Sequence, residues 1–172
     1  AALPQSPITR MVLNDVGPVV TSVSLRRIAE YVGKAPKFAS LDEADRYIRA
    51  VSAPFGPLTD AQWRHLTVHS TRPMPDGGFE MGYDPDIAKP MQAMLFLGDI
   101  ELWNLYEAIR CPTLCVRGAE SDLLTRDTLA QMAARGPKAR TLEIAGVGHA
   151  PMFMDHAQTA PIEQFLTEGF TA

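Results

Sequence analysis

The sequence has few cysteines, no excess of basic residues and no long hydrophobic run, and each absence excludes a class of protein. Its 172 residues include 16 Lys and Arg against 20 Asp and Glu, so the net charge of -4 has the wrong sign for a nucleic-acid-binding surface. The apolar runs are far shorter than the roughly 20 residues that a membrane-spanning helix needs. We therefore expect a globular domain that binds neither nucleic acid nor a membrane.

The two cysteines, Cys111 and Cys115, do not predict a disulfide framework. They lie four positions apart on one predicted strand, which places their Cα atoms roughly 13 Å apart and beyond disulfide reach. They also do not form a Cys-x-x-Cys redox motif. We expect two small buried side chains in a reducing compartment, typical of a cytoplasmic protein.

Three short apolar runs, at residues 8–13, 112–116 and 140–145, predict buried strands. A helix that begins after Thr125 and stops at Gly136-Pro137 connects the second run to the third, so these strands should be parallel neighbours. Residues Pro161 to Phe170 predict a closing helix with Pro161 at its first position. The expected fold class is α/β, with three parallel strands and flanking helices.

Residues 21–109 have a different pattern, in which helical segments alternate with Pro and Gly punctuation. The helices expected there run from Ser24 to Val32, from Leu41 to Val51 and from Thr59 to Val68. Ser40 should cap the second, and Thr59 or Asp60 the third. Residues 75–79 predict a tight turn in a small hairpin or loop. We expect an all-helical insertion at 21–109, with residues 1–20 and 110–172 forming the core.

The predicted sheet has an unpaired apolar edge at Met11-Val12-Leu13. Parallel strands are normally paired on both sides and covered on both faces, and an open edge invites aggregation. We therefore interpret the chain as the C-terminal portion of a larger domain, whose remainder is a second chain or a segment cut away.

Polar motifs follow the second and third predicted strands. The first reads Arg117-Gly118-Ala119-Glu120-Ser121-Asp122 and the second reads Gly146-Val147-Gly148-His149. The carboxyl ends of parallel strands share one rim of a sheet, where open α/β sheets bind ligands. His149 can accept and return a proton, and a carboxylate that orients its ring supplies a second part of a nucleophilic hydrolase. We favour Asp122 as that carboxylate, with Asp15, after the first strand, as the alternative acid.

With these motifs in this order, the chain resembles the second half of an α/β-hydrolase, from the strand before the cap to the C-terminus. The resemblance rests on Leu13-Asn14-Asp15, the helical insertion, the Ser121-Asp122 turn and Gly148-His149-Ala150-Pro151. It covers essentially the whole chain and implies that the insertion is a cap, or lid, over the site. The nucleophile elbow of the family, Gly-x-Ser-x-Gly, does not occur in this sequence.

The resemblance implies an esterase-like serine hydrolase that cleaves an ester or similar acyl bond without a cofactor. His149 would act as general base and Asp122 would orient it. The expected partners are an N-terminal fragment that carries the nucleophile and a small apolar ester-like substrate, so this chain alone should be inactive. Alternatives stay open: a carbon–carbon bond hydrolase similar to meta-cleavage-product hydrolases, an aspartate-nucleophile dehalogenase or epoxide hydrolase, or a member that only binds a small ligand.

Aromatic and methionine side chains assigned to the insertion are candidates for an apolar substrate pocket, and they suit a packing seam equally well. The candidates are Trp63, Tyr83, Met91, Met94 and Trp103. His65 and His69 have a spacing that could bind a metal on a helix, but the sequence offers no third ligand. We expect no metal site.

Overall fold

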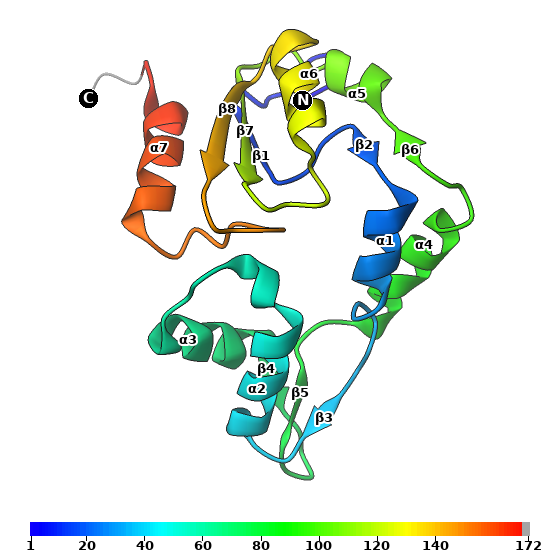
Figure 1. Ribbon diagram of the computed structural model, residues 1–172, viewed down its shortest axis with the longest axis vertical. Helices are drawn as coiled ribbons and strands as arrows, with labels where there is room; N and C mark the ends of the chain where they lie inside the picture. The colour runs from blue at the N-terminus through cyan, green and yellow to red at the C-terminus, as the bar shows by residue number, and fades with distance from the viewer. Residues whose placement is uncertain (170–172) are drawn as a thin grey trace. The chain divides into compact units, whose positions relative to one another are not determined.

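The computed structural model describes residues 1–169. The chain divides into two compact units (Figure 1). The first, here called the sheet unit, contains Ala1–Thr21 and the residues from Asp99 onward, and the second, the insertion unit, contains Ser22–Gly98. Residues 99–109, which the sequence pattern assigned to the insertion, therefore lie in the sheet unit.

A parallel sheet forms the centre of the sheet unit. Its strands β1 (Met11–Asn14), β7 (Thr113–Gly118) and β8 (Arg140–Ile144) lie in the order β1-β7-β8. Both pairs are parallel, with Leu13 opposite Cys115 and Val116 opposite Leu142. The three predicted strands and the α/β class are thus confirmed, and the first strand begins later than the apolar run predicted.

Strand β7 is buried along its whole length because helices cover both faces of the sheet. Cys115 packs on one face in a cluster with Tyr106 of α5 (Trp103–Glu107) and Met132 of α6 (Arg126–Ala134). Leu114 and Val116 point to the other face, where they pack against Phe165 of α7 (His156–Thr167). Because successive side chains of β7 pack against helices on opposite faces of the sheet, the carboxyl end of the strand is held in place from both sides.

The ends of α6 and α7 show how local sequence sets helix boundaries. The Thr125 hydroxyl accepts a hydrogen bond from the Thr128 amide at 3.1 Å, so α6 begins where the sequence predicted. Helix α7 begins earlier than predicted, because the Asp155 carboxylate caps it at the Gln158 amide, 3.0 Å away. Pro161 lies inside α7 rather than at its first position, and the expected end at Phe170 falls outside the described residues.

A short antiparallel ladder joins the two segments that lead into and out of the insertion unit. Strand β2 (Val19–Val20) pairs with β6 (Ile100–Glu101), and the Leu102 amide donates to the Pro18 carbonyl at 2.6 Å. The ladder holds the segment that leads into the insertion unit against the segment that leads out of it, within the sheet unit.

The insertion unit contains strands as well as helices. Its sheet has the antiparallel order β3-β5-β4, so the expectation of an all-helical insertion is wrong. The strands are too short for an alternating pattern to appear in the sequence. The elements are α1 (Ser22–Ala29), β3 (Lys37–Phe38), α2 (Leu41–Val51), η1 (Ala53–Phe55), α3 (Asp60–Ser70), β4 (Thr71–Pro73), β5 (Phe79–Met81), η2 (Pro85–Ile87) and α4 (Ala88–Met94).

In the insertion unit, the predicted helix caps and the predicted turn are confirmed. Ser40 caps α2 through the Glu43 amide at 3.2 Å, and Thr59 caps α3 in a reciprocal capping box with Gln62. The predicted turn at 75–79 joins β4 to β5 as a hairpin. None of the helices within residues 1–169 is long and apolar enough to cross a bilayer.

The two cysteines are free, as predicted, but only Cys115 is buried, and the prediction of burial is wrong for Cys111, which is half-buried. Burial raises the pKa of the Cys115 thiol to about 12. At pH 8 such a thiol holds roughly 10³-fold less thiolate than an ordinary cysteine. Iodoacetamide should therefore modify the half-buried Cys111 first, as measured by peptide mass mapping of the folded protein, and should reach Cys115 only in urea. Equal rates at both positions without urea would contradict the packing of β7.

Candidate active site

Asp15 follows β1 directly and its carboxylate is fully buried. Its amide extends the ladder by donating to the Val116 carbonyl at 2.7 Å, while a φ of 55° turns the chain away from the sheet. Aspartate tolerates this left-handed conformation better than most residues. The turn leaves the carboxylate above the end of β7, where Oδ1 accepts a hydrogen bond from the Gly118 amide at 2.9 Å.

His149 lies in the loop after β8 and reaches across the end of β7 to Asp15. Its Nδ1 is 2.8 Å from Asp15 Oδ2, and its side chain is 21% exposed. An ionised carboxylate only accepts hydrogen bonds, so Nδ1 carries the proton and Nε2 is left to exchange one. The pair thus combines a buried carboxylate with a ring that solvent or a substrate can reach, as proton transfer requires.

Close backbone packing lets the loop after β8 cross the end of β7. A Cβ at Gly118 would lie 2.3 Å from the Gly148 carbonyl oxygen, so only glycine allows the two backbones to approach this closely. The Glu120 amide donates to the Val147 carbonyl at 2.9 Å, which fixes one loop on the other. On the far side, the Asn14 side chain donates to the Pro151 carbonyl at 3.0 Å. Together these contacts fix the loop that carries His149 to the ends of β7 and β1.

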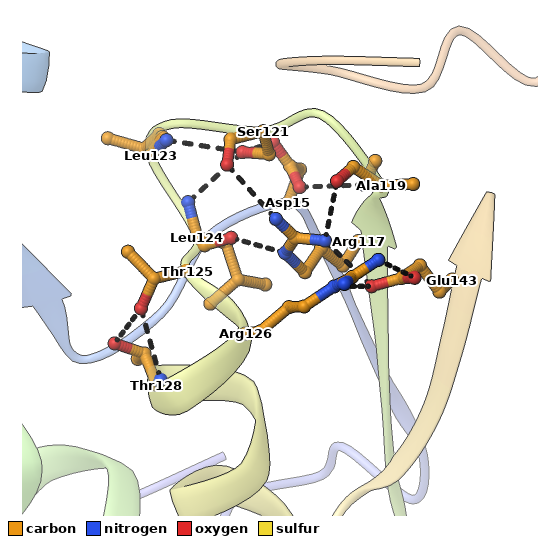
Figure 2. Close-up of polar contacts among 11 residues, drawn as sticks. Asp15, Arg117, Ala119, Ser121, Leu123, Leu124, Thr125, Arg126, Thr128 and Glu143 are labelled. Atoms are coloured by element: carbon orange, nitrogen blue, oxygen red, sulfur yellow. Dashed lines mark hydrogen bonds and ion pairs between the residues drawn. The ribbon is translucent and has the colours of Figure 1, made fainter. Parts of the chain in front are cut away.

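The loop after β7 is held by Arg117 and turns Ser121 toward Asp15 (Figure 2). The Ser121 hydroxyl donates to Asp15 Oδ2 at 2.6 Å. Arg117 is buried and pairs with Glu143 of β8 at 2.7 Å. Hydrogen bonds from Arg126 first and from Arg117 second lower the pKa of the Glu143 carboxyl.

The acid that contacts Nδ1 of His149 is Asp15, the alternative, and not Asp122, which the sequence favoured. Asp122 is exposed, because Ser121 faces inward to Asp15 and the adjacent residue faces solvent. Asp122 and His149 follow neighbouring strands, and the prediction of a contact between them rests on this adjacency. The signal that it missed is Gly118, which allows the His149 loop to pass over β7 to the strand beyond.

The five substrate-pocket candidates fall in both units. Trp63 is buried in the insertion unit with the Arg49 guanidinium 5.6 Å from its ring centre, and Tyr83 donates to the Lys34 carbonyl there. Met91 is half-buried and Met94 exposed, both on α4. Trp103 is in the sheet unit, contrary to its assignment to the insertion, and packs edge-on against Tyr106 with Arg135 over its ring at 3.9 Å. Trp63 and Trp103 are thus packing residues within separate units.

The structure gives no support for a metal at His65 and His69. Their rings lie 4.3 Å apart on α3. Within residues 1–169 no group of three or more His, Cys, Asp or Glu side chains could hold a metal ion.

An apolar cavity of about 280 Å³ opens beside the end of β1. It begins at Val16 and Gly17, directly after Asp15, and its wall includes Leu13, Leu105 and Tyr106. No sequence motif pointed to this cavity, because its wall combines residues from distant segments of the chain. Its wall is mostly hydrophobic, and two of its residues, Val16 and Gly17, follow Asp15 directly in the chain.

The sequence of this chain matches a known protein family. Residues 5–162 match the Alpha/beta hydrolase family. The chain belongs to this family. It is 42% identical to the 3-hydroxybutyrate-oligomer hydrolase of Cupriavidus necator over 97% of this chain and 59% of that protein. Family membership establishes the fold that the sequence resemblance implied.

Two solved structures share the fold of this chain. An alpha/beta hydrolase from Novosphingobium aromaticivorans is 32% identical, with a TM-score of 0.79 over 92% of this chain and 56% of that one. A protein from Rickettsia typhi has a TM-score of 0.81 at 28% identity, over 93% of this chain and 54% of that one. The present chain therefore spans between one half and two thirds of the length of these family members.

Proposed function

We propose that the full-length protein is a serine hydrolase of carboxylic esters, in which this chain supplies the acid–base pair Asp15–His149. The observation that carries the proposal is the 2.8 Å contact between a fully buried carboxylate and Nδ1 of a partly exposed histidine. This is the arrangement that fixes the tautomer of a catalytic imidazole and stabilises its protonated form. The nucleophile would come from the part of the protein outside this chain, since the sequence contains no Gly-x-Ser-x-Gly.

In the proposed reaction, Nε2 of His149 takes the proton of the nucleophilic serine as its oxygen attacks the ester carbonyl. The resulting imidazolium is stabilised by the Asp15 carboxylate, which stays ionised. As the tetrahedral intermediate collapses, the imidazolium gives its proton to the departing alcohol, and an acyl-serine remains. Water then repeats the same steps, with His149 as base, and releases the carboxylic acid and the serine.

The substrate class we propose is a short oligoester of a small hydroxy acid. The support is the 42% identical relative from C. necator, whose name describes a hydrolase of 3-hydroxybutyrate oligomers. Such substrates carry an ester at every repeat and small aliphatic groups between the esters. Attack of a serine on the ester carbonyl, with His149 as general base, can cleave each of these esters. The alternatives of carbon–carbon bond or carbon–halogen cleavage have no comparable support.

We further propose that the complementing part of the protein pairs with the open edge of β1. Among residues 1–169, β1 forms a ladder with β7 only. The apolar cavity lies at the end of the same strand, at Leu13 and Val16. An apolar edge strand beside an apolar cavity is a surface that a further strand and helix would cover.

The proposal is tested with the full-length protein and two substrates, p-nitrophenyl butyrate and the linear dimer of 3-hydroxybutyrate. We expect turnover of both, and no turnover of the amide analogue of the dimer as the control. A phosphonate directed at active-site serines should inactivate the protein and add its mass to a serine outside the 172 residues. Absence of ester turnover, or labelling of a serine within this chain, would contradict the proposal.

A further inference from the structure

We propose that Ser121 is a positioning residue, whose hydroxyl holds the Asp15 carboxylate in the orientation that binds His149. The inference deepens the proposed function and rests on it, since a positioning role matters only if the pair transfers protons. Ser121 is not part of the acid–base pair. Its hydroxyl forms hydrogen bonds with Asp15 and with the amides of Leu123 and Leu124.

The hydrogen-bond partners of Ser121 leave its hydroxyl proton only one direction. The Ser121 oxygen accepts hydrogen bonds from the amides of Leu123 at 3.2 Å and Leu124 at 3.1 Å (Figure 2). A hydroxyl has two acceptor positions and one donor. With both acceptor positions used by backbone amides, the remaining proton points to Asp15 Oδ2, 2.6 Å away. Such a short contact to an ionised acceptor is typical of a strong, charge-assisted hydrogen bond.

Arg117 fixes the backbone of the loop that carries Ser121, so the loop cannot easily turn Ser121 away from Asp15. Arg117 binds three carbonyls of this one loop: Nε donates to Leu124 at 2.6 Å, Nη1 to Ala119 at 3.0 Å and Nη2 to Ser121 at 3.1 Å (Figure 2). The guanidinium is planar, so a single rigid fork sets all three positions. Its buried charge is balanced by Glu143, which also binds Arg126 at 3.0 Å.

Ser121 and His149 share one oxygen of the Asp15 carboxylate. Both contact Asp15 Oδ2, while Oδ1 is held by the Gly118 amide. Without the hydroxyl, only the Gly118 amide and the imidazole itself hold the carboxylate, so the orientation of Oδ2 toward Nδ1 is fixed less tightly. Loss of the hydrogen-bond partner behind a metal-bound imidazole typically costs about 10- to 100-fold in activity, and we expect a loss of similar size here.

The test measures kcat, KM and thermal unfolding of the full-length protein carrying Ser121→Ala, Ser121→Cys or Ser121→Thr, with p-nitrophenyl butyrate. Ser121→Ala and the near-isosteric Ser121→Cys should lower kcat about 10- to 100-fold with KM little changed, because the ester itself does not contact Ser121. Ser121→Thr keeps the hydroxyl and should recover most of the lost kcat.

The matched control is Thr125→Ala, on the same loop. Thr125 caps α6 through its own hydroxyl and is exposed, so its loss should destabilise the same region without touching Asp15. We expect a lower unfolding temperature and wild-type kcat. If Ser121→Ala and Ser121→Cys keep wild-type kcat, or lose no more of it than Thr125→Ala does, the positioning role is wrong.

A second readout separates this inference from the proposed function. The Nδ1 proton of His149 should give a far-downfield ¹H NMR signal, which Ser121→Ala should shift and Thr125→Ala should not. If the wild type hydrolyses no ester, the proposed function fails, yet this shift still tests the contact. An unchanged signal in Ser121→Ala would overturn the positioning role whether or not the protein is an esterase.

Discussion

Replacing Asp15 with asparagine should lower kcat for ester hydrolysis about 10⁴-fold, which is the typical cost of losing the carboxylate behind a catalytic histidine. An amide is nearly isosteric with the carboxylate but carries no charge. It can also present its NH₂ to Nδ1, which would place the imidazole proton on Nε2 and leave the ring unable to act as a base. The measurement is kcat of the full-length Asp15→Asn variant with p-nitrophenyl butyrate.

Asp122→Asn is the matched control for this experiment, since it makes the same chemical change at an exposed carboxylate that follows the neighbouring strand. We expect it to cost far less than Asp15→Asn. Circular dichroism of both variants should show that the sheet is retained. A large loss of kcat in Asp122→Asn, with near wild-type kcat in Asp15→Asn, would restore the assignment that the sequence alone favoured.

Replacing His149 with glutamine should have the largest effect on catalysis, a loss of about 10⁶-fold in kcat. Glutamine can accept a hydrogen bond but cannot take a proton from a serine hydroxyl at neutral pH, so the acylation step loses its base. KM should change much less, because substrate binding does not depend on proton transfer. Stopped assays with a high enzyme concentration can measure the residual rate.

His156→Gln is the corresponding control, because His156 is an exposed residue in the first turn of α7. It should keep wild-type kcat and KM. If His149→Gln retained activity within tenfold of the wild type, His149 would have no role as a base. The structural contact with Asp15 would then serve loop stability alone.

The sequence predicts best where a feature depends on neighbouring residues. The apolar run that forms β7, the Thr125 cap of α6 and the Ser40 cap of α2 each depend on a few adjacent side chains, and all three are confirmed. The two-residue strand β3 cannot be predicted in this way, because its pairing with β5, and not a pattern in its own residues, makes it a strand. Helix α7 shows a similar limit, because the cap at Asp155 and not Pro161 sets its start.

The identity of the carboxylate that binds His149 cannot be predicted from the sequence without knowledge of how the strands and loops are arranged. From the sequence, His149 belongs at the rim of the sheet, and both Asp15 and Asp122 follow strands at that rim. The choice between them depends on how far the loop after β8 crosses the sheet, and the Gly118–Gly148 approach decides this. Such an approach is a tertiary contact between segments that are far apart in the chain.

The most direct test of the central claim, that Asp15 holds Nδ1 of His149, is the downfield ¹H NMR signal of the Nδ1 proton in three forms of the full-length protein. We expect this signal in the wild type and in Asp122→Asn, and we expect it to disappear or move strongly upfield in Asp15→Asn. A signal that survives in Asp15→Asn and disappears in Asp122→Asn would contradict the contact on which the proposed mechanism depends.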